Sequence, residues 1–298
     1  MHYLTYLYKD RDNYGILTTD KKGVIPMNLL LKELDKEVPT SLLDFIRTYS
    51  NSLSSDLAEL LRKKNLNSIS IDHIKILSPI PYPRRNIFCL GKNYADHAME
   101  IKSLPGGTAE IPKEPIYFTK IADPAIGHKD YIVIPKEYTN QLDYEVELAI
   151  IIARDGKNIS IEQAQDYIFG YTIGNDISAR DIQKRHIQWF KGKSLDNSTS
   201  IGPWIVDKSL IKFPIELDIS CKVNKEVRQS SNTRNLIFDI ATIISDLSKG
   251  LTLRAGDIIL TGTPAGVGLG MDPPQFLKSG DIVECSIENI GNLINYVK

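Results

Sequence analysis

The chain reads LDYEVELAIII from Leu142 to Ile152, and this stretch decides the fold. Side chains on a β-strand alternate between two faces, so Asp143, Glu145 and Glu147 are expected to share one face. The apolar residues that follow, 148–152, have no polar face at all, which indicates a strand buried on both sides. We therefore expect this strand near the centre of a sheet, with acidic side chains running into the protein interior.

Other strand-like runs surround this stretch, at residues 86–90, 116–119, 131–134, 171–177, 215–223, 257–261 and 281–287. Two helical patterns interrupt them. One is a capping-box sequence that begins at Ser160 and predicts a helix ending before Gly170, and the other is an apolar stripe at helical spacing from Leu236 to Leu247. The order of elements is irregular rather than alternating βαβ. It favours a mixed, mainly β fold of the α+β class over a doubly wound parallel sheet.

Residues 1–78 are typical of a small α/β domain. Two strand-like runs, 3–8 and 14–18, precede two helical patterns, one starting near Ser41 and one covering residues 56–64. The prolines that follow, Pro79, Pro81 and Pro83, alternate along the chain, which forbids a helix and favours an extended linker. The sequence therefore predicts a domain boundary at residue 78 and a second domain over residues 79–298.

Composition restricts the class of partner. The chain has 298 residues, of which 42% are hydrophobic, and this is enough to bury a substantial core. Its 36 Lys and Arg residues nearly balance 37 Asp and Glu, so no electrostatic footprint for nucleic acid or an anionic membrane exists. The longest apolar run, residues 148–153, is far shorter than the roughly 20 residues of a membrane-spanning helix. We expect a small-molecule partner, with no nucleic acid and no membrane.

The N-terminus and the cysteines indicate the cellular compartment. Residues 1–6 lack the basic start and the apolar stretch of a signal peptide, which predicts a cytoplasmic protein. The three cysteines, Cys89, Cys221 and Cys285, have no spacing typical of zinc or of a disulfide framework. We expect them to be buried thiols.

The acidic side chains of the central strand need a compensating charge if they are buried. A divalent cation supplies it, and ligands that are all oxygen favour Mg²⁺, Mn²⁺ or Ca²⁺ over zinc. Asp176, at the end of a later strand-like run, could provide a further ligand beside Glu145 and Glu147. The alternative is that these acids lie on a solvent-exposed face, which for an isolated E-x-E pattern is favoured by about ten to one.

Five blocks of sequence, taken in order, resemble the fumarylacetoacetate hydrolase family. They are GKNYADH at 91–97, LDYEVEL at 142–148, GNDISARD at 174–181, QWFKGKS at 188–194 and LTGTPAGVG at 260–268. The resemblance covers residues 84–298, whereas residues 1–78 are similar only loosely to the variable N-terminal domains of some members. It implies a mixed β-roll or sandwich catalytic domain, a homodimer, and Mg²⁺ or Mn²⁺ (with Ca²⁺ as a possible substitute) bound through Glu145, Glu147 and Asp176.

The resemblance also implies a class of reaction. Members of the family cleave carbon–carbon bonds in acylpyruvates, decarboxylate oxaloacetate, or isomerise unsaturated 2-oxo diacids. A 2-oxo acid can chelate a metal ion through its carboxylate and keto oxygens, and the ion then stabilises negative charge on the keto oxygen. Cleavage and decarboxylation both leave an enolate of pyruvate, so one electrostatic arrangement serves both reactions. The first hypothesis is an acylpyruvate-type hydrolase, the alternatives being a decarboxylase, an isomerase or a non-catalytic scaffold.

Four further residues match substrate-binding or catalytic positions of the family. Lys193 matches a lysine that points at the substrate, although a solvated surface lysine is the usual case. Gln183 matches a position that hydrogen-bonds substrate, and without the resemblance it reads as a helix-surface residue. Thr263 lies in a Gly- and Pro-rich loop that could bind a carboxylate, but a structural turn explains the same loop almost as well. Lys92 stands where several members have Arg, and a lysine lacks the bidentate fork of arginine.

His97 and Glu100 are three residues apart, so on a helix they would share a face and could hydrogen-bond. Glu100 would orient the imidazole while His97 takes a proton from water, which then attacks the distal carbonyl of the substrate. Without the resemblance, a surface histidine beside an incidental acid is the commoner case. Residues 104–108, LPGGT, predict a flexible loop that closes over the substrate.

Overall fold

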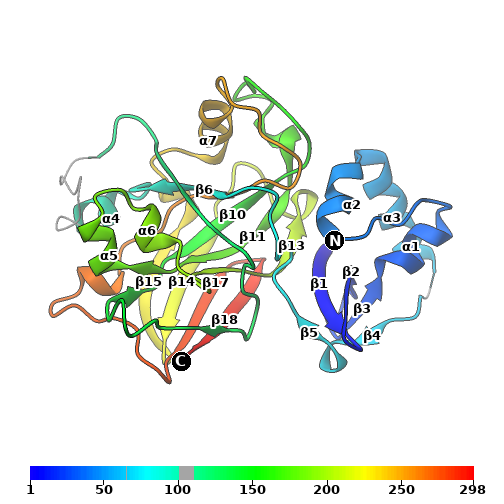
Figure 1. Ribbon diagram of the computed structural model, residues 1–298. Helices are drawn as coiled ribbons and strands as arrows, with labels where there is room; N and C mark the ends of the chain where they lie inside the picture. Colours follow the sequence, from blue (N-terminus) through cyan, green and yellow to red (C-terminus); the bar gives the residue numbers. More distant parts are fainter. Residues whose placement is uncertain (65, 101–110) are drawn as a thin grey trace.

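The computed structural model describes residues 1–64, 66–100 and 111–298. Within these ranges the chain forms a sheet of 11 strands, a second sheet of 5 strands and a 2-stranded ribbon, with short helices around them (Figure 1). The α+β class with β-structure predominating is confirmed. In the same ranges, no helix combines the length and the apolar character that crossing a membrane would require.

The large sheet carries β10 (Val146–Ile152) among its central strands. Its order is β4 (Ile69–Ser70), β3 (Gly23–Pro26), β2 (Arg11–Leu17), β1 (His2–Tyr8), β13 (Thr199–Asp207), β11 (Ile168–Asp176), β10, β16 (Ile258–Leu260), β6 (Ile87–Gly91) and β7 (Ile116–Lys120), with β5 (Lys75–Ile76) beside β1. β10 runs antiparallel to both β11 and β16, and all of its residues are buried. The expectation of a strand buried on both faces is confirmed.

The second sheet covers one face of β10 and β11. Its order is β15 (Glu226–Asn232), β14 (Asp218–Val223), β17 (Ile282–Ile287), β18 (Gly291–Val297) and β8 (Tyr131–Ile132). Leu148 and Ile150 of β10 belong to the apolar core that this sheet shares, whereas Ala149 and Ile151 belong to a second core that includes the N-terminal helices. The two cores explain why residues 148–152 of β10 have no polar face.

The N-terminal residues extend the large sheet. β1 pairs antiparallel with β13, with Tyr3 opposite Ile205, so strands β1 to β5 continue the sheet on the right of Figure 1. Three helices cover this end: α1 (Met27–Glu33), α2 (Leu42–Thr48) and α3 (Asn51–Lys63). The rings of Tyr3 and Phe169 lie 4.9 Å apart across the junction. The large sheet and the second core therefore both contain residues from before and after residue 78. The domain boundary at that residue stays a prediction.

The continuous strand expected through Tyr144 and Glu145 is wrong at its start. β9 (Leu142–Asp143) ends before these two residues and pairs with β12 (Ser178–Ala179), while β10 begins after them. At the break, side-chain amides replace strand partners: the N–H of Glu145 donates to Asn175 Oδ1 at 3.0 Å. The alternation of side chains between the two faces of the sheet therefore does not continue from Asp143 to Glu147. The carboxylate of Asp143 does not join the other acids but accepts hydrogen bonds from the backbone N–H groups of residues 268 and 269.

The helix expected after Ser160 is also wrong. Residues there form turns and the short 3₁₀ helix η2 (Ala164–Tyr167), because the segment lacks an apolar stripe along which a longer helix could pack. The second helical pattern is confirmed over Ile240–Leu247 as α7, whose N-cap Asp239 accepts the N–H of Thr242 at 2.8 Å, but Leu236, expected at its start, lies outside the helix in a bridge with Tyr94. The remaining helices are α4 (Ala95–Glu100), α5 (Arg180–Arg185), α6 (Phe190–Lys193), η1 (Ile71–His73), η3 (Lys208–Leu210), η4 (Thr233–Asn235) and η5 (Gly268–Gly270).

Candidate active site

Three buried carboxylates meet where β10 and β11 pair. Glu145 precedes β10, Glu147 lies within it and Asp176 ends β11, and one oxygen from each lies within 4.8 Å of the others. The pairing explains the convergence, since the N–H of Asp176 donates to the carbonyl of Glu145 at 2.9 Å. The structure thus brings together the three residues expected as metal ligands.

Three buried cations surround these acids. Lys193 Nζ on α6 lies 2.6 Å from Glu145 Oε2 and 2.7 Å from Asp176 Oδ2. Lys120 Nζ at the end of β7 lies 2.5 Å from Asp176 Oδ1, and Arg180 Nη2 lies 2.7 Å from Glu145 Oε1. Arg180 stands within a block quoted for the resemblance, but Lys120 gives no signal in the sequence because a lysine ending a strand is usually exposed.

Burial and charge perturb the site strongly. Burial alone would raise the pKa of Glu145, but Lys193 and Arg180 outweigh it and lower that pKa to about 2. Burial raises the pKa of Glu147 well above its usual range, and Asp176 and Glu145 raise it further. For Lys193, burial would lower the pKa, yet the charges of Asp176 and Glu145 raise it overall. Each of these shifts follows from like and opposite charges held together out of water.

This donor set fits a hard dication. One oxygen from each of three buried carboxylates lies within 4.8 Å of the others, and burial together with the charges of Asp176 and Glu145 raises the pKa of Glu147. Mg²⁺ and Mn²⁺ prefer oxygen ligands of this kind, and either would relieve the repulsion among the three carboxylates.

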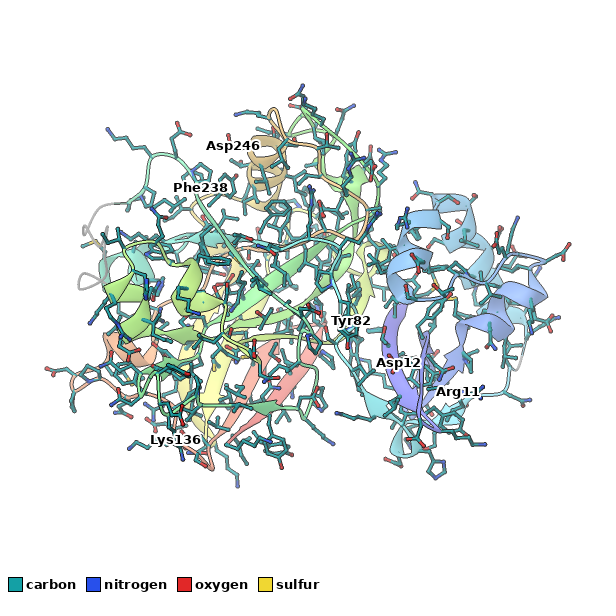
Figure 2. The ribbon with its side chains drawn as sticks, viewed as in Figure 1. Arg11, Asp12, Tyr82, Lys136, Phe238 and Asp246 are labelled. Atoms are coloured by element: carbon teal, nitrogen blue, oxygen red, sulfur yellow. The ribbon has the colours of Figure 1, made fainter. Side chains whose placement is uncertain are left out.

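The expected pair of His97 and Glu100 lies on α4. His97 Nδ1 is 3.3 Å from Glu100 Oε2, and the imidazole is buried. The N–H of Gly266 donates to both oxygens of Glu100, at 2.9 and 3.2 Å. The start of α4 is anchored by Asn93, whose Nδ2 donates to the carbonyl of Phe238, labelled in Figure 2, at 3.1 Å. Glu100 is therefore held by the backbone while it contacts the imidazole.

One pocket gathers most of the predicted site residues. Its walls include Lys92, His97, Glu145, Glu147, Gln183, Lys193 and Thr263, together with Leu90, Gly91, Phe118, Arg180 and Trp189. Asp176 and Glu100 do not line it, and they lie behind Lys193 and His97, which they contact. Glu145, Glu147, His97 and Lys193 thus line the same pocket.

The other residues predicted to bind substrate are Gln183, Thr263 and Lys92, and their surroundings differ. Gln183 Oε1 accepts from Arg180 Nη1 at 3.1 Å, which makes the amide nitrogen the group that can donate to a ligand. The hydroxyl of Thr263 donates to the carbonyl of Val146 at 2.9 Å, a contact that fits the alternative in which this loop is a structural turn. Lys92 is buried, with a φ of 54°. The loop expected at residues 104–108 lies outside the described residues.

Known proteins resemble this chain over nearly its whole length. The family model described as fumarylacetoacetate (FAA) hydrolase C-terminal matches residues 86–298. Oxaloacetate tautomerase YisK of Bacillus subtilis is 46% identical over 290 residues, which is 95% of either chain. A fumarylacetoacetate hydrolase structure from Exiguobacterium antarcticum has a TM-score of 0.83 and 36% identity, covering 100% of this chain and 99% of its own. Maleylpyruvate hydrolase from Sphingobium sp. SYK-6, in complex with manganese(II) and pyruvate, has a TM-score of 0.77 and 26% identity, covering 100% and 98%.

Proposed function

Because this chain belongs to the fumarylacetoacetate hydrolase family, we propose that it is a Mg²⁺- or Mn²⁺-dependent enzyme that interconverts the keto and enol forms of oxaloacetate. The observation that carries the proposal is the meeting of three buried carboxylates with His97 and Lys193 in one pocket. The relative named oxaloacetate tautomerase supports the choice of reaction. The neighbour bound to manganese(II) and pyruvate supports the choice of metal and of a 2-oxo acid.

With a dication bound, the charge of the pocket favours an anionic substrate. Lys92 and Lys193 line it, and the guanidinium of Arg180 forms part of the same wall. A bound dication would add two further positive charges beside them. Glu145 and Glu147 line the same pocket and offset part of this positive charge, and an anionic 2-oxo acid such as oxaloacetate balances the remainder.

Tautomerisation moves one proton between C3 and the oxygen on C2. When bound by Glu145, Glu147 and Asp176, the dication supplies Lewis-acid stabilisation of negative charge on that oxygen. Since Glu100 engages Nδ1 of His97, the other ring nitrogen takes the C3 proton, and the electron pair moves toward the C2 oxygen. The Lys193 ammonium pairs with the negative charge, and return of the proton to the oxygen completes the enol and restores neutral His97.

A second candidate is the hydrolysis of an acylpyruvate, which the pairing of His97 with Glu100 favours. In that reaction His97 takes a proton from water, and the resulting hydroxide adds to the distal carbonyl. The carbon–carbon bond then breaks, which releases a carboxylic acid and the enolate of pyruvate. The two candidates differ in whether water is a reactant.

The test uses the purified chain loaded with Mg²⁺ or Mn²⁺. Fresh oxaloacetate is supplied in its enol form, and the decay of the enol's ultraviolet absorbance is followed together with CO₂ release; acetate release from acetylpyruvate is measured in parallel. A faster decay without CO₂ supports the tautomerase. CO₂ release indicates a decarboxylase, and acetate indicates the hydrolase. No acceleration over a Glu147→Gln control in any assay would contradict the enzymatic proposal and favour a scaffold.

We also propose, from the family resemblance, that the chain is a homodimer, and from its likeness to the Bacillus subtilis relative that it acts in the cytoplasm. Light scattering coupled to size-exclusion chromatography tests the first of these. Fractionation of the source cells tests the second.

A further inference from the structure

The break between β9 and β10 places two buried side chains against the loop that follows β16. Asp143 Oδ1 accepts the N–H of Gly268 at 2.8 Å, and its Oδ2 accepts the N–H of Leu269 at 3.0 Å. The hydroxyl of Tyr144 donates to the carbonyl of Gly266 at 3.0 Å. Two consecutive residues thus hold both ends of residues 266–269.

The same loop holds Glu100. The N–H of Gly266 donates to both carboxylate oxygens of Glu100, and a Cβ at Gly270 would lie only 2.2 Å from Glu100 Cδ. Gly266 itself has a φ of 104°, and a Cβ there would lie 1.9 Å from the carbonyl oxygen of Arg228. The loop therefore meets Glu100 at close range, with a backbone conformation that favours glycine.

We propose that Tyr144 and Asp143 are positioning residues that fix the loop 266–269 and, through the N–H of Gly266, orient Glu100 toward His97. The proposal rests on the proposed function for its kinetic consequence. Asp143 has a further link, because its Oδ2 also accepts Arg180 Nε at 2.8 Å. Arg180 in turn contacts Glu145 and Gln183, so the carboxylate of Asp143 connects the loop that holds Glu100 to three residues that line the pocket.

Tyr144→Phe is the informative variant, because it removes one hydrogen bond and keeps the buried ring. We expect kcat to fall about tenfold, less than the roughly 10²-fold or greater loss expected when Glu100→Gln removes the carboxylate itself. KM and the affinity for Mn²⁺ should not change, since Tyr144 does not line the pocket. The matched control is Tyr14→Phe, which removes a similar hydrogen bond, from Tyr14 to the carbonyl of Pro39 at 2.7 Å, far from the loop.

A double-mutant cycle separates positioning from general destabilisation. If Tyr144 acts through Glu100, adding Tyr144→Phe to Glu100→Gln should lower kcat no further. If the double variant instead lost kcat by the product of the two single-variant factors, the proposal would be overturned. It would also be overturned if Tyr14→Phe lost as much kcat as Tyr144→Phe, or if Tyr144→Phe lost affinity for Mn²⁺.

Amide hydrogen exchange tests the same link without turnover. Protection of the Gly266 N–H should fall in Tyr144→Phe and stay unchanged in Tyr14→Phe, and equal protection in wild type and Tyr144→Phe would overturn the proposal. If the wild-type protein turned over none of the assayed substrates, the proposed function would fail, while this measurement would still decide whether Tyr144 holds the loop.

Discussion

Replacing Glu147 by Gln should stabilise the metal-free protein and at the same time abolish its response to metal. The carboxylate oxygens of Glu145, Glu147 and Asp176 lie within 4.8 Å of one another. At that separation two unit charges repel by about 3.5 kcal/mol at an effective dielectric constant of ~20, so the two neighbours together give roughly 7 kcal/mol before any offset. Attraction to Lys193 and proton uptake by Glu147 remove most of this repulsion. We expect a net gain of about 1–3 kcal/mol in the free energy of unfolding.

The shape of the site allows this substitution. Glu147 Oε2 accepts the N–H of Gly262 at 2.7 Å, and the amide oxygen of a glutamine can accept the same hydrogen bond. Mn²⁺ at about 100 times its dissociation constant should stabilise the wild type by about 2.7 kcal/mol and the variant hardly at all, because one ligand has lost its charge.

Urea unfolding followed by circular dichroism, with EDTA and then with Mn²⁺, measures both effects. Glu216→Gln, which changes an exposed carboxylate, is the matched control and should leave both unchanged. The electrostatic reasoning would be refuted if Glu147→Gln were less stable than wild type in EDTA, or if it gained as much stability from Mn²⁺ as wild type does.

Three further predictions concern other charged groups. Lys120→Met should lower the free energy of unfolding of the metal-free protein by about 3–5 kcal/mol in urea titrations, because Asp176 loses a buried partner; a loss below 1 kcal/mol would contradict this. His97→Asn should lower kcat by about 10²- to 10⁴-fold with Mn²⁺ affinity unchanged, and an equal loss of both would show that His97 supports the metal site instead. Burial, then the charge of Lys21, lower the pKa of His2 to about 4 in the folded protein. The neutral ring is therefore favoured by folding, so stability should fall as the pH drops from about 6.5 to about 4, and His2→Gln should flatten that part of the curve.

The N-terminal residues shape the core on one side of the site. Ala149 and Ile151 of β10 share a core with the N-terminal helices, and Glu147 lies two residues before Ala149 in the same strand. Removing residues 1–78 would therefore expose the apolar face of the strand that positions Glu147. This physical link is independent of where a domain boundary is drawn.

Local spacing was enough to predict the buried strand at 148–152 and most of the helix that ends at Leu247. It also placed His97 and Glu100 on one helix face, but only the resemblance favoured that pair over a surface histidine. Each depends on side chains two, three or four residues apart, whose relative direction follows from strand or helix geometry. Asp176 was already a candidate ligand from its place at the end of a strand-like run; the resemblance matched it to the metal site and added Lys193. Both residues lie far from Glu145 in sequence. The break at Tyr144 and Glu145 was not foreseeable, because it depends on amides from Asn175 and Gln229 replacing strand partners.

The sequence by itself determined the mainly β class, the buried central strand and the acidic residues placed at its start, since these follow from alternation and composition over a few neighbouring residues. Only the tertiary structure decided that Lys120 would be buried against Asp176, that Asp143 would turn to the loop and to Arg180, and that β1 would join β13. These contacts join segments remote in the chain, and their register is set by packing across the whole sheet, which no local pattern encodes.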